Sequence, residues 1–94
     1  MPNVLRINPA DNVVMALHDL PAGTSLDLGG SEGVLAIANA EPIPFGHKVA
    51  IAPIHKGQEV IKYGASIGVA RGDIAPGQHV HVHNLASVRG AARS

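Results

Sequence analysis

Three of the six histidines in this chain occupy alternate positions in the segment GQHVHVHNL, residues 77–85. On a strand, His79, His81 and His83 project from one face, with successive Cα atoms of the series ~6.6 Å apart and the outer two ~13 Å apart. Because a metal–imidazole bond measures about 2 Å, at most two adjacent histidines can bind one ion unless the strand bends. The third then orients a group, transfers a proton or binds substrate. Alternatively, the three form the polar face of an ordinary solvent-exposed strand.

Two further pairs of residues could serve the same chemistry. His47 directly follows Gly46, where a small residue lets a ligand approach the backbone, so we expect His47 to be catalytic. Lys48 points to the opposite face of a strand and is either a substrate-binding cation or a solvated strand charge. Lys62 and Tyr63 alternate in the same way. One of these two is expected to anchor a substrate carboxylate or exchange a proton, although Tyr63 could equally be a core aromatic residue.

A repeated turn pattern supplies the framework for these residues. An Asp or Pro, an apolar residue, two variable residues, Gly, two mostly polar residues and a final Leu or Val recur along the chain. The glycine allows a positive φ, and the final apolar residue begins or anchors a strand. Asp19 and Asp73 open two copies, where we expect each carboxylate to accept a hydrogen bond from its own backbone two residues on. The copies are DLPAGTSL (19–26), PIHKGQEV (53–60) and DIAPGQHV (73–80).

The rest of the chain predicts a single small all-β domain. Eleven Gly and seven Pro leave no room for a long helix, and no apolar stripe of helical period is sustained. With 94 residues and small aliphatic side chains as its apolar content, the domain has a narrow stability margin, which favours burial against a partner or a second copy. The expected strand segments are short and rich in β-branched residues: 13–17, 33–39, 47–54, 59–64, 66–70 and 79–85.

The composition narrows the classes of function. Seven Lys and Arg balance seven Asp and Glu, so the charge of the protein gives no reason to expect a nucleic-acid or membrane partner. The chain has no Cys, which excludes disulfides and thiolate metal sites supplied by this chain. The N-terminal segment lacks the apolar region of a signal peptide, and no apolar run reaches the length of a membrane span. We therefore expect a cytoplasmic protein.

Three motifs in order identify a family. Gly46-His47-Lys48 is followed by KYGASIG (62–68) and then by GQHVHVHN (77–84). Together they resemble the SAF-type β-clip module of the altronate and galactarate dehydratase family, over about residues 13–85. The resemblance implies a small β-clip domain spanning residues 1–94, with 86–94 as a flexible tail. Its more specific motifs lie in the second half of the chain.

The resemblance also implies a lyase that eliminates water from a sugar acid with a divalent metal as cofactor, and we expect this metal to be iron. Elimination needs a base for the proton α to the carboxylate, positive charge on the developing enediolate, and an acid for the departing hydroxyl. For this chemistry we expect His79, His81 and His83 to bind the metal or transfer protons, and Lys48 and Asn84 to bind the hydroxy acid. The chain then corresponds to a small subunit, or to the N-terminal domain of a fused enzyme, that completes its active site with a large catalytic subunit.

Two alternatives stay open. The chain is also similar to the small subunit of sulfolactate sulfo-lyase, in which sulfite leaves instead of water, and the same enolate chemistry serves both reactions. Related β-clip modules bind carbohydrate without catalysing a reaction. The alternating histidines favour an enzyme over such a binding module but do not exclude the module.

Overall fold

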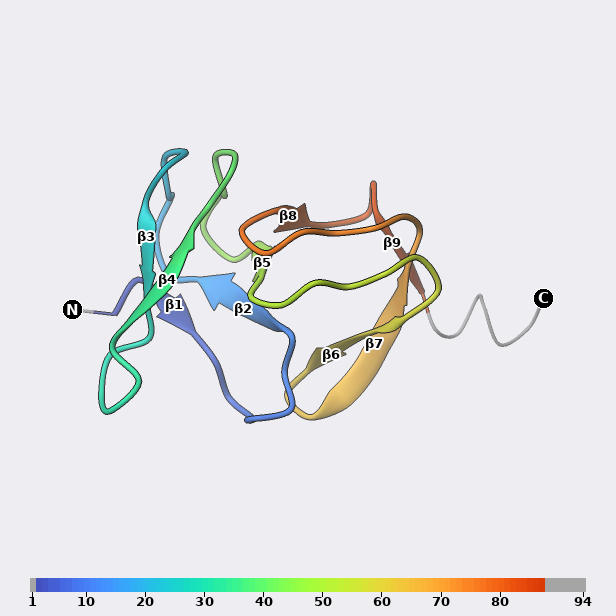
Figure 1. The fold of residues 1–94 in the computed structure, drawn as a ribbon, viewed down its shortest axis with the longest axis horizontal. Coiled ribbons are helices and arrows are strands. Elements are labelled where there is room, and N and C mark those ends of the chain that lie inside the picture. The colour runs from blue at the N-terminus through green and yellow to red at the C-terminus, as the bar shows by residue number, and fades with distance from the viewer. Residues whose placement is uncertain (1, 88–94) are drawn as a thin grey trace.

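The computed structural model describes residues 2–87, which form nine short strands (Figure 1). An antiparallel sheet of order β1-β2-β5-β8 lies between the β3-β4 hairpin on one side and the sheet β6-β7-β9 on the other. Across these residues, nothing helical has the length and apolar character needed to cross a membrane. The strands are β1 (Val4–Leu5), β2 (Val13–Ala16), β3 (Ser25–Asp27), β4 (Val34–Ala38), β5 (Lys48–Ala50), β6 (Glu59–Lys62), β7 (Ala65–Ala70), β8 (His79–Val80) and β9 (Leu85–Ser87).

Both faces of the four-stranded sheet are buried under small aliphatic side chains. Because side chains alternate along a strand, Val14 and Val49 join one core cluster, while Val13, Ala50 and Val80 join the other. The first cluster packs against the β3-β4 hairpin, and the second packs against β6-β7-β9. The all-β fold predicted from the sequence is therefore confirmed, with two small cores that share one sheet.

Four copies of the turn pattern build this architecture, one more than the three predicted. The additional copy is PIPFGHKV, residues 42–49. In every copy the residue after the glycine donates its N–H to the carbonyl three residues earlier, at 2.9–3.3 Å, and the glycine has φ between 83° and 91°. Such a turn needs glycine because an ordinary side chain disfavours this φ. The copies associate in two pairs through bridges between Leu20 and Ile43 and between Ile54 and Ile74.

The aspartates that open two of the turns hold each pair together. Asp19 accepts a hydrogen bond from the backbone N–H of Phe45 at 2.8 Å, and Asp73 accepts one from that of Lys56 at 2.9 Å. The predicted bond to their own backbone is therefore wrong. The pairing of the turns brings a neighbouring N–H within reach of each carboxylate, so the aspartates stabilise the contact between turns rather than a single turn.

Five of the six predicted strands are shorter in the structure, and two of them differ most. The sequence predicts one strand over 79–85, whereas β8 ends at Val80 and residues 81–84 form a turn before β9 begins. The segment 47–54 contributes a strand only over Lys48–Ala50, because the next turn pattern begins at Pro53. The predicted flexible tail, 86–94, lies largely outside the described residues.

Asn12 connects the central sheet to the β6-β7 hairpin. Its side chain accepts a hydrogen bond from the backbone N–H of Ile61 at 2.7 Å and donates one to the carbonyl of Glu59 at 3.0 Å. Its own N–H also donates to the carbonyl of Ile61 at 3.2 Å. A single asparagine thus satisfies backbone groups along β6 that no neighbouring strand reaches.

The buried carboxylate of Asp11 anchors the tip of the same hairpin. It accepts hydrogen bonds from the backbone N–H of Gly64 at 2.7 Å and of Asn8 at 3.2 Å. Burial by itself raises the pKa of Asp11, but backbone hydrogen bonds outweigh it and bring the pKa below the ordinary 3.8. The backbone groups responsible belong to Gly64, Tyr63, Asn8 and Ile7.

Replacing Gly77 with Ala is expected to destabilise the domain more than the same change at Gly23. Both glycines have positive φ, so each alanine carries about 1–2 kcal/mol of backbone strain. A Cβ at Gly23 meets open space, whereas a Cβ at Gly77 collides with the carbonyl oxygen of Ala38. Urea unfolding is expected to show the larger loss for Gly77→Ala. Equal losses would contradict the close packing of this turn against β4.

A pH titration of stability tests the Asp11 anchor. Because the folded-state pKa lies below 3.8, the contribution of Asp11 is complete above the unfolded-state pKa and is lost as the pH falls through the lower, folded value. Asp11→Asn is expected to reduce the free energy of unfolding at pH 7 by about 1–3 kcal/mol and to flatten this acid dependence. Glu59→Gln, at an exposed carboxylate, is the control. Unchanged stability and acid profile in Asp11→Asn would show that the carboxylate is no anchor.

Candidate functional site

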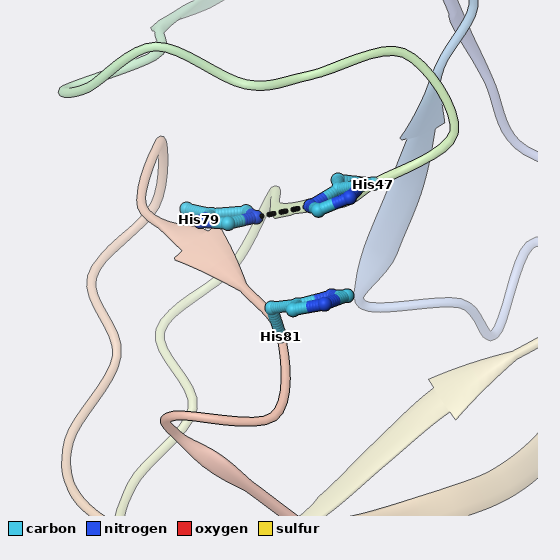
Figure 2. A group of neighbouring side chains, drawn as sticks. All are labelled: His47, His79 and His81. Carbon is cyan, nitrogen blue, oxygen red and sulfur yellow. Dashed lines mark hydrogen bonds between the residues drawn. The ribbon is translucent and has the colours of Figure 1, made fainter.

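Three half-buried histidines from two distant segments meet at one edge of the central sheet (Figure 2). The Nδ1 atom of His47 lies 2.9 Å from Nε2 of His79. The ring of His81 stacks on that of His47, with centroids 4.1 Å apart and planes 12° apart. One ring nitrogen from each residue lies within 4.8 Å of the other two. The structure therefore brings His47, predicted as a catalytic residue, into one cluster with two of the alternating histidines.

The turn over residues 42–49 sets the position of His47. Its backbone N–H donates to the carbonyl of Pro44 at 3.0 Å, and its carbonyl accepts from the N–H of Ala16 on β2 at 2.9 Å. Gly46 donates to the carbonyl of Ala16 at 2.9 Å from the other side. His47 thus leaves the turn with its backbone fixed on both sides before β5 begins.

The register of β5 against β8 brings the other two histidines to the same place. Val49 pairs with His79, and Lys48 pairs with Val80. Since paired residues share a face and the strands are antiparallel, continuing this register places His47 opposite His81. The close stacking of these two rings follows directly from the pairing.

A turn held by Asn84 bends the chain after β8. The side chain of Asn84 donates to the carbonyl of His79 at 2.7 Å and accepts from the N–H of His81 at 2.9 Å. The bend returns His83 toward His79, with ring centroids 5.3 Å apart and a tilt of 42°. Asn84, predicted to bind substrate, uses both ends of its amide to shape this turn.

Burial and neighbouring charges lower the pKa of His79. Loss of solvation contributes most, followed by the imidazoles of His47 and His83. The Glu41 carboxylate acts in the opposite direction, and it also accepts a hydrogen bond from the backbone N–H of His79 at 3.2 Å. His79 is therefore neutral at pH 7, the form that can bind a metal or accept a proton.

The pKa of His81 is lowered as well. Partial burial contributes most, followed by electrostatic repulsion from His47, Lys48 and His83. The pKa of Lys48 is itself lowered, first by burial and then by repulsion from Lys62. Lys48 thus lies within electrostatic reach of both His81 and Lys62. Lys48 therefore couples the histidine cluster electrostatically to Lys62.

Tyr63 lies in the two-residue turn between β6 and β7 instead of on a strand. It adopts φ 57°, and its side chain is 50% exposed, so it is not a core aromatic residue. The ammonium of Lys62 lies 4.7 Å from the centroid of its ring. The predicted alternation of Lys62 and Tyr63 to opposite faces is therefore wrong, because the chain leaves the strand at Lys62 and the two side chains meet.

Glu41 belongs to this region but was not predicted as a site residue. A signal for it exists in the sequence, because Glu41 precedes the fourth copy of the turn pattern, PIPFGHKV. That copy places His47 one residue after its glycine, much as His79 follows Gly77 by two. The strands that follow these two turns, β5 and β8, pair with each other, and this pairing brings their histidines together.

A shallow apolar hollow of about 340 Å³ has none of the clustered histidines in its lining. Its one titratable side chain, Asp19, is hydrogen-bonded to a backbone N–H. We therefore assign the chemistry to the histidine cluster, where several titratable groups converge. The hollow is lined by Asp19, Leu20, Pro21, Pro42, Ile43 and Pro44.

Comparisons with known proteins match nearly the whole described chain. The family model described as the altronate/galactarate dehydratase SAF domain matches residues 2–88. Altronate dehydratase of Escherichia coli (strain K12) is 44% identical over 80 residues, covering 85% of this chain and 15% of that protein. Altronate dehydratase of Bacillus subtilis (strain 168) is 38% identical over 84 residues, which cover 89% of this chain and 16% of that protein. The chain thus spans less than one-fifth of the length of these two relatives.

A shorter relative matches about half of this chain. Subunit alpha of (2R)-sulfolactate sulfo-lyase from Chromohalobacter salexigens is 45% identical over 49 residues, which cover 52% of this chain and 52% of that subunit. The similarity therefore reaches both a long protein and a named subunit of an assembly.

Removing the charge of Lys48 is expected to raise the pKa of His81, because a like charge disfavours the imidazolium. Lys48→Gln is compared with Lys56→Gln, which removes an exposed lysine in another turn. The histidine ring resonances are followed by NMR against pH in EDTA-treated protein. An unchanged His81 titration in Lys48→Gln would contradict the charge coupling described above.

Proposed function

The chain belongs to the altronate/galactarate dehydratase SAF domain family, and from that membership we propose that it is part of a hydro-lyase that removes water from a sugar acid such as altronate or galactarate. The matched region makes up 15% and 16% of two altronate dehydratases. The proposal therefore includes a large catalytic partner, either as a separate subunit or as a further domain. It places the enzyme in the cytoplasm.

The observation that carries this proposal is that Lys48 lies within electrostatic reach of His81 in the histidine cluster and of Lys62. Within residues 2–87, no ion pair engages Lys48 or Lys62. Their charges are therefore available to a substrate carboxylate, while His81, within electrostatic reach of Lys48, can accept a proton. A carboxylate-binding group next to a proton acceptor is what elimination from a hydroxy acid requires.

In this proposal, dehydration proceeds through an enediolate intermediate. A base removes the proton α to the carboxylate, and the electron pair of that C–H bond moves toward the carboxylate to form an enediolate. The β-hydroxyl leaves with a proton from an acid as one water, and the resulting enol becomes a 2-oxo-3-deoxy acid. We assign Lys48 and Lys62 to the carboxylate, where their charge stabilises the enediolate. We assign His81 and His47 to proton transfer, with Tyr63 orienting the Lys62 ammonium.

A divalent metal, with iron as the first choice, belongs to the proposal for the complete enzyme. When bound, it polarises the carboxylate and hydroxyl oxygens of the substrate. The residues present fit such a group, since imidazole nitrogen is a ligand for iron and other first-row ions and three imidazoles converge here. In this proposal the large partner supplies the main base and further ligands.

A sulfo-lyase is the second candidate. It is supported by the larger share of the relative's own length that the match covers. The sulfolactate sulfo-lyase subunit is matched over 52% of its own length, against 15% for an altronate dehydratase. In that reaction sulfite leaves from the β-carbon in place of hydroxide. The same lysines and imidazoles would stabilise the same type of carbanion, so the substrate assay must decide.

The test is an activity assay on the chain purified together with its large partner. The complex is assayed for dehydration of altronate and galactarate and for release of sulfite from (2R)-sulfolactate. His81→Ala is expected to lower kcat by about 10²- to 10⁴-fold, the usual effect of losing a general acid or base. His18→Ala, at an exposed histidine outside the cluster, is the control and retains activity.

Each outcome of this assay points to one function. Activity on sulfolactate alone would replace the hydro-lyase with the sulfo-lyase. Full dehydration activity in His81→Ala would remove the proposed catalytic role and leave the chain as a binding module of the larger enzyme.

A further inference from the structure

We propose that His47, His79 and His81 form a binding site for one first-row transition-metal ion, such as Zn²⁺ or Co²⁺, and that this chain binds the ion without its large partner. The inference deepens the proposed function, because it assigns the ligands of the metal to this chain, and with an ion bound His47 and His81 act as ligands while proton transfer falls to the partner's base. It stands on the geometry of the three imidazoles and does not require that the lyase assignment be correct.

The ring nitrogens are already close to a coordinating arrangement. One nitrogen from each histidine lies within 4.8 Å of the others. Tetrahedral ligands at 2.0–2.1 Å from zinc are about 3.3 Å apart. The 2.9 Å separation of His47 Nδ1 and His79 Nε2 is slightly shorter than this value. Small rotations of the rings are therefore enough to admit an ion, which would replace the proton that bridges these two nitrogens.

The backbone holds each ligand in place before an ion binds. His47 and His81 are each fixed through the backbone N–H, to the Pro44 carbonyl at 3.0 Å and to the Asn84 side chain at 2.9 Å. His79 lies on β8 itself, paired with β5. Ligands on rigid paired elements lose little conformational freedom on binding, which favours affinity.

The donor set selects the class of metal. All three ligands are imidazoles, whereas Mg²⁺ and Ca²⁺ require oxygen donors. Three histidine ligands leave a fourth position open, as in catalytic zinc sites. Lys48 opposes a cation at this position and Glu41 offsets that charge. We therefore expect binding weaker than that of a closed structural zinc site.

Glu41 acts as a positioning residue in this site. Its carboxylate accepts the backbone N–H of His79 at 3.2 Å, so it orients a ligand without contacting the ion. Outer partners that accept the ring N–H of a ligating histidine typically contribute 10- to 100-fold to metal affinity, and Glu41, which accepts the backbone N–H, is placed at the lower end of that range. Glu41→Gln keeps the shape and an acceptor oxygen while removing the charge, and it is expected to weaken binding about 10-fold.

The test measures metal binding by the purified 94-residue chain. EDTA-treated protein is titrated with Zn²⁺ by calorimetry and with Co²⁺ by visible absorption, whose intensity reports coordination geometry. One ion per chain is expected, with a rise in Tm that grows with metal concentration because the ion binds the folded state. Mg²⁺ is expected to produce neither signal. Circular dichroism confirms that each variant folds.

Variants locate the ion. His81→Ala and His47→Ala are each expected to weaken Zn²⁺ binding by more than about 100-fold, beyond the effect of losing an outer partner. His55→Ala, at an exposed histidine in the turn 53–60, is the matched control and leaves binding unchanged. Absence of saturable binding would overturn the proposal, and so would an equal loss in His55→Ala or a loss in His83→Ala as large as that in His81→Ala.

The readout separates this inference from the lyase assignment. Metal binding by the chain with an inactive complex would contradict the proposed function alone. An active complex whose small chain binds no metal would overturn the metal site alone.

Discussion

The antiparallel pairing of β5 with β8 is the constraint on which the site depends. Val49 pairs with His79, and this register places His47 across from His81. A shift of one residue would turn His79 of β8 to the opposite face of the sheet, where Val80 now packs in the core. The burial of Val49 and Val80 therefore fixes the register, and the register fixes the imidazoles.

The same paired turns build both the core and the site. Leu20 with Ile43, and Ile54 with Ile74, are the apolar residues of the four turns, and all four side chains are buried. The positions after the glycines are then free to carry polar groups such as His47 at the surface. A domain with small aliphatic side chains and little core volume can therefore carry a cluster of titratable groups, because its stability comes from positions that do not overlap with the site.

The sequence predicted the elements that depend on local patterns and missed those that depend on distant contacts. Glycines in turns and β-branched segments act over a few residues, so the all-β fold and three turns could be predicted. The contact of His47 with His79 joins residues 32 positions apart, and no local pattern encodes the register between their strands. Candidate residues could be proposed from the sequence, but which of them lie together in the fold could not.

The bend after β8 was missed for a different physical reason. The turn over 81–84 contains neither Gly nor Pro, and the side chain of Asn84 closes it through two hydrogen bonds. An alternating His–Val pattern therefore predicts a strand until the competing side-chain bonds are known. The bend brings His83 next to His79, which a straight strand would not allow.

The central claim is that His47 and His81 act in one site, and a double-mutant cycle on the catalytic complex tests it most directly. The kcat/KM of His47→Ala, His81→Ala and the double variant is compared with that of the wild type. The account predicts that the double variant loses little more activity than the more damaging single variant, since groups acting as one unit are not additive. Losses in free energy that simply add would contradict it, because they would mean that the two stacked imidazoles act independently.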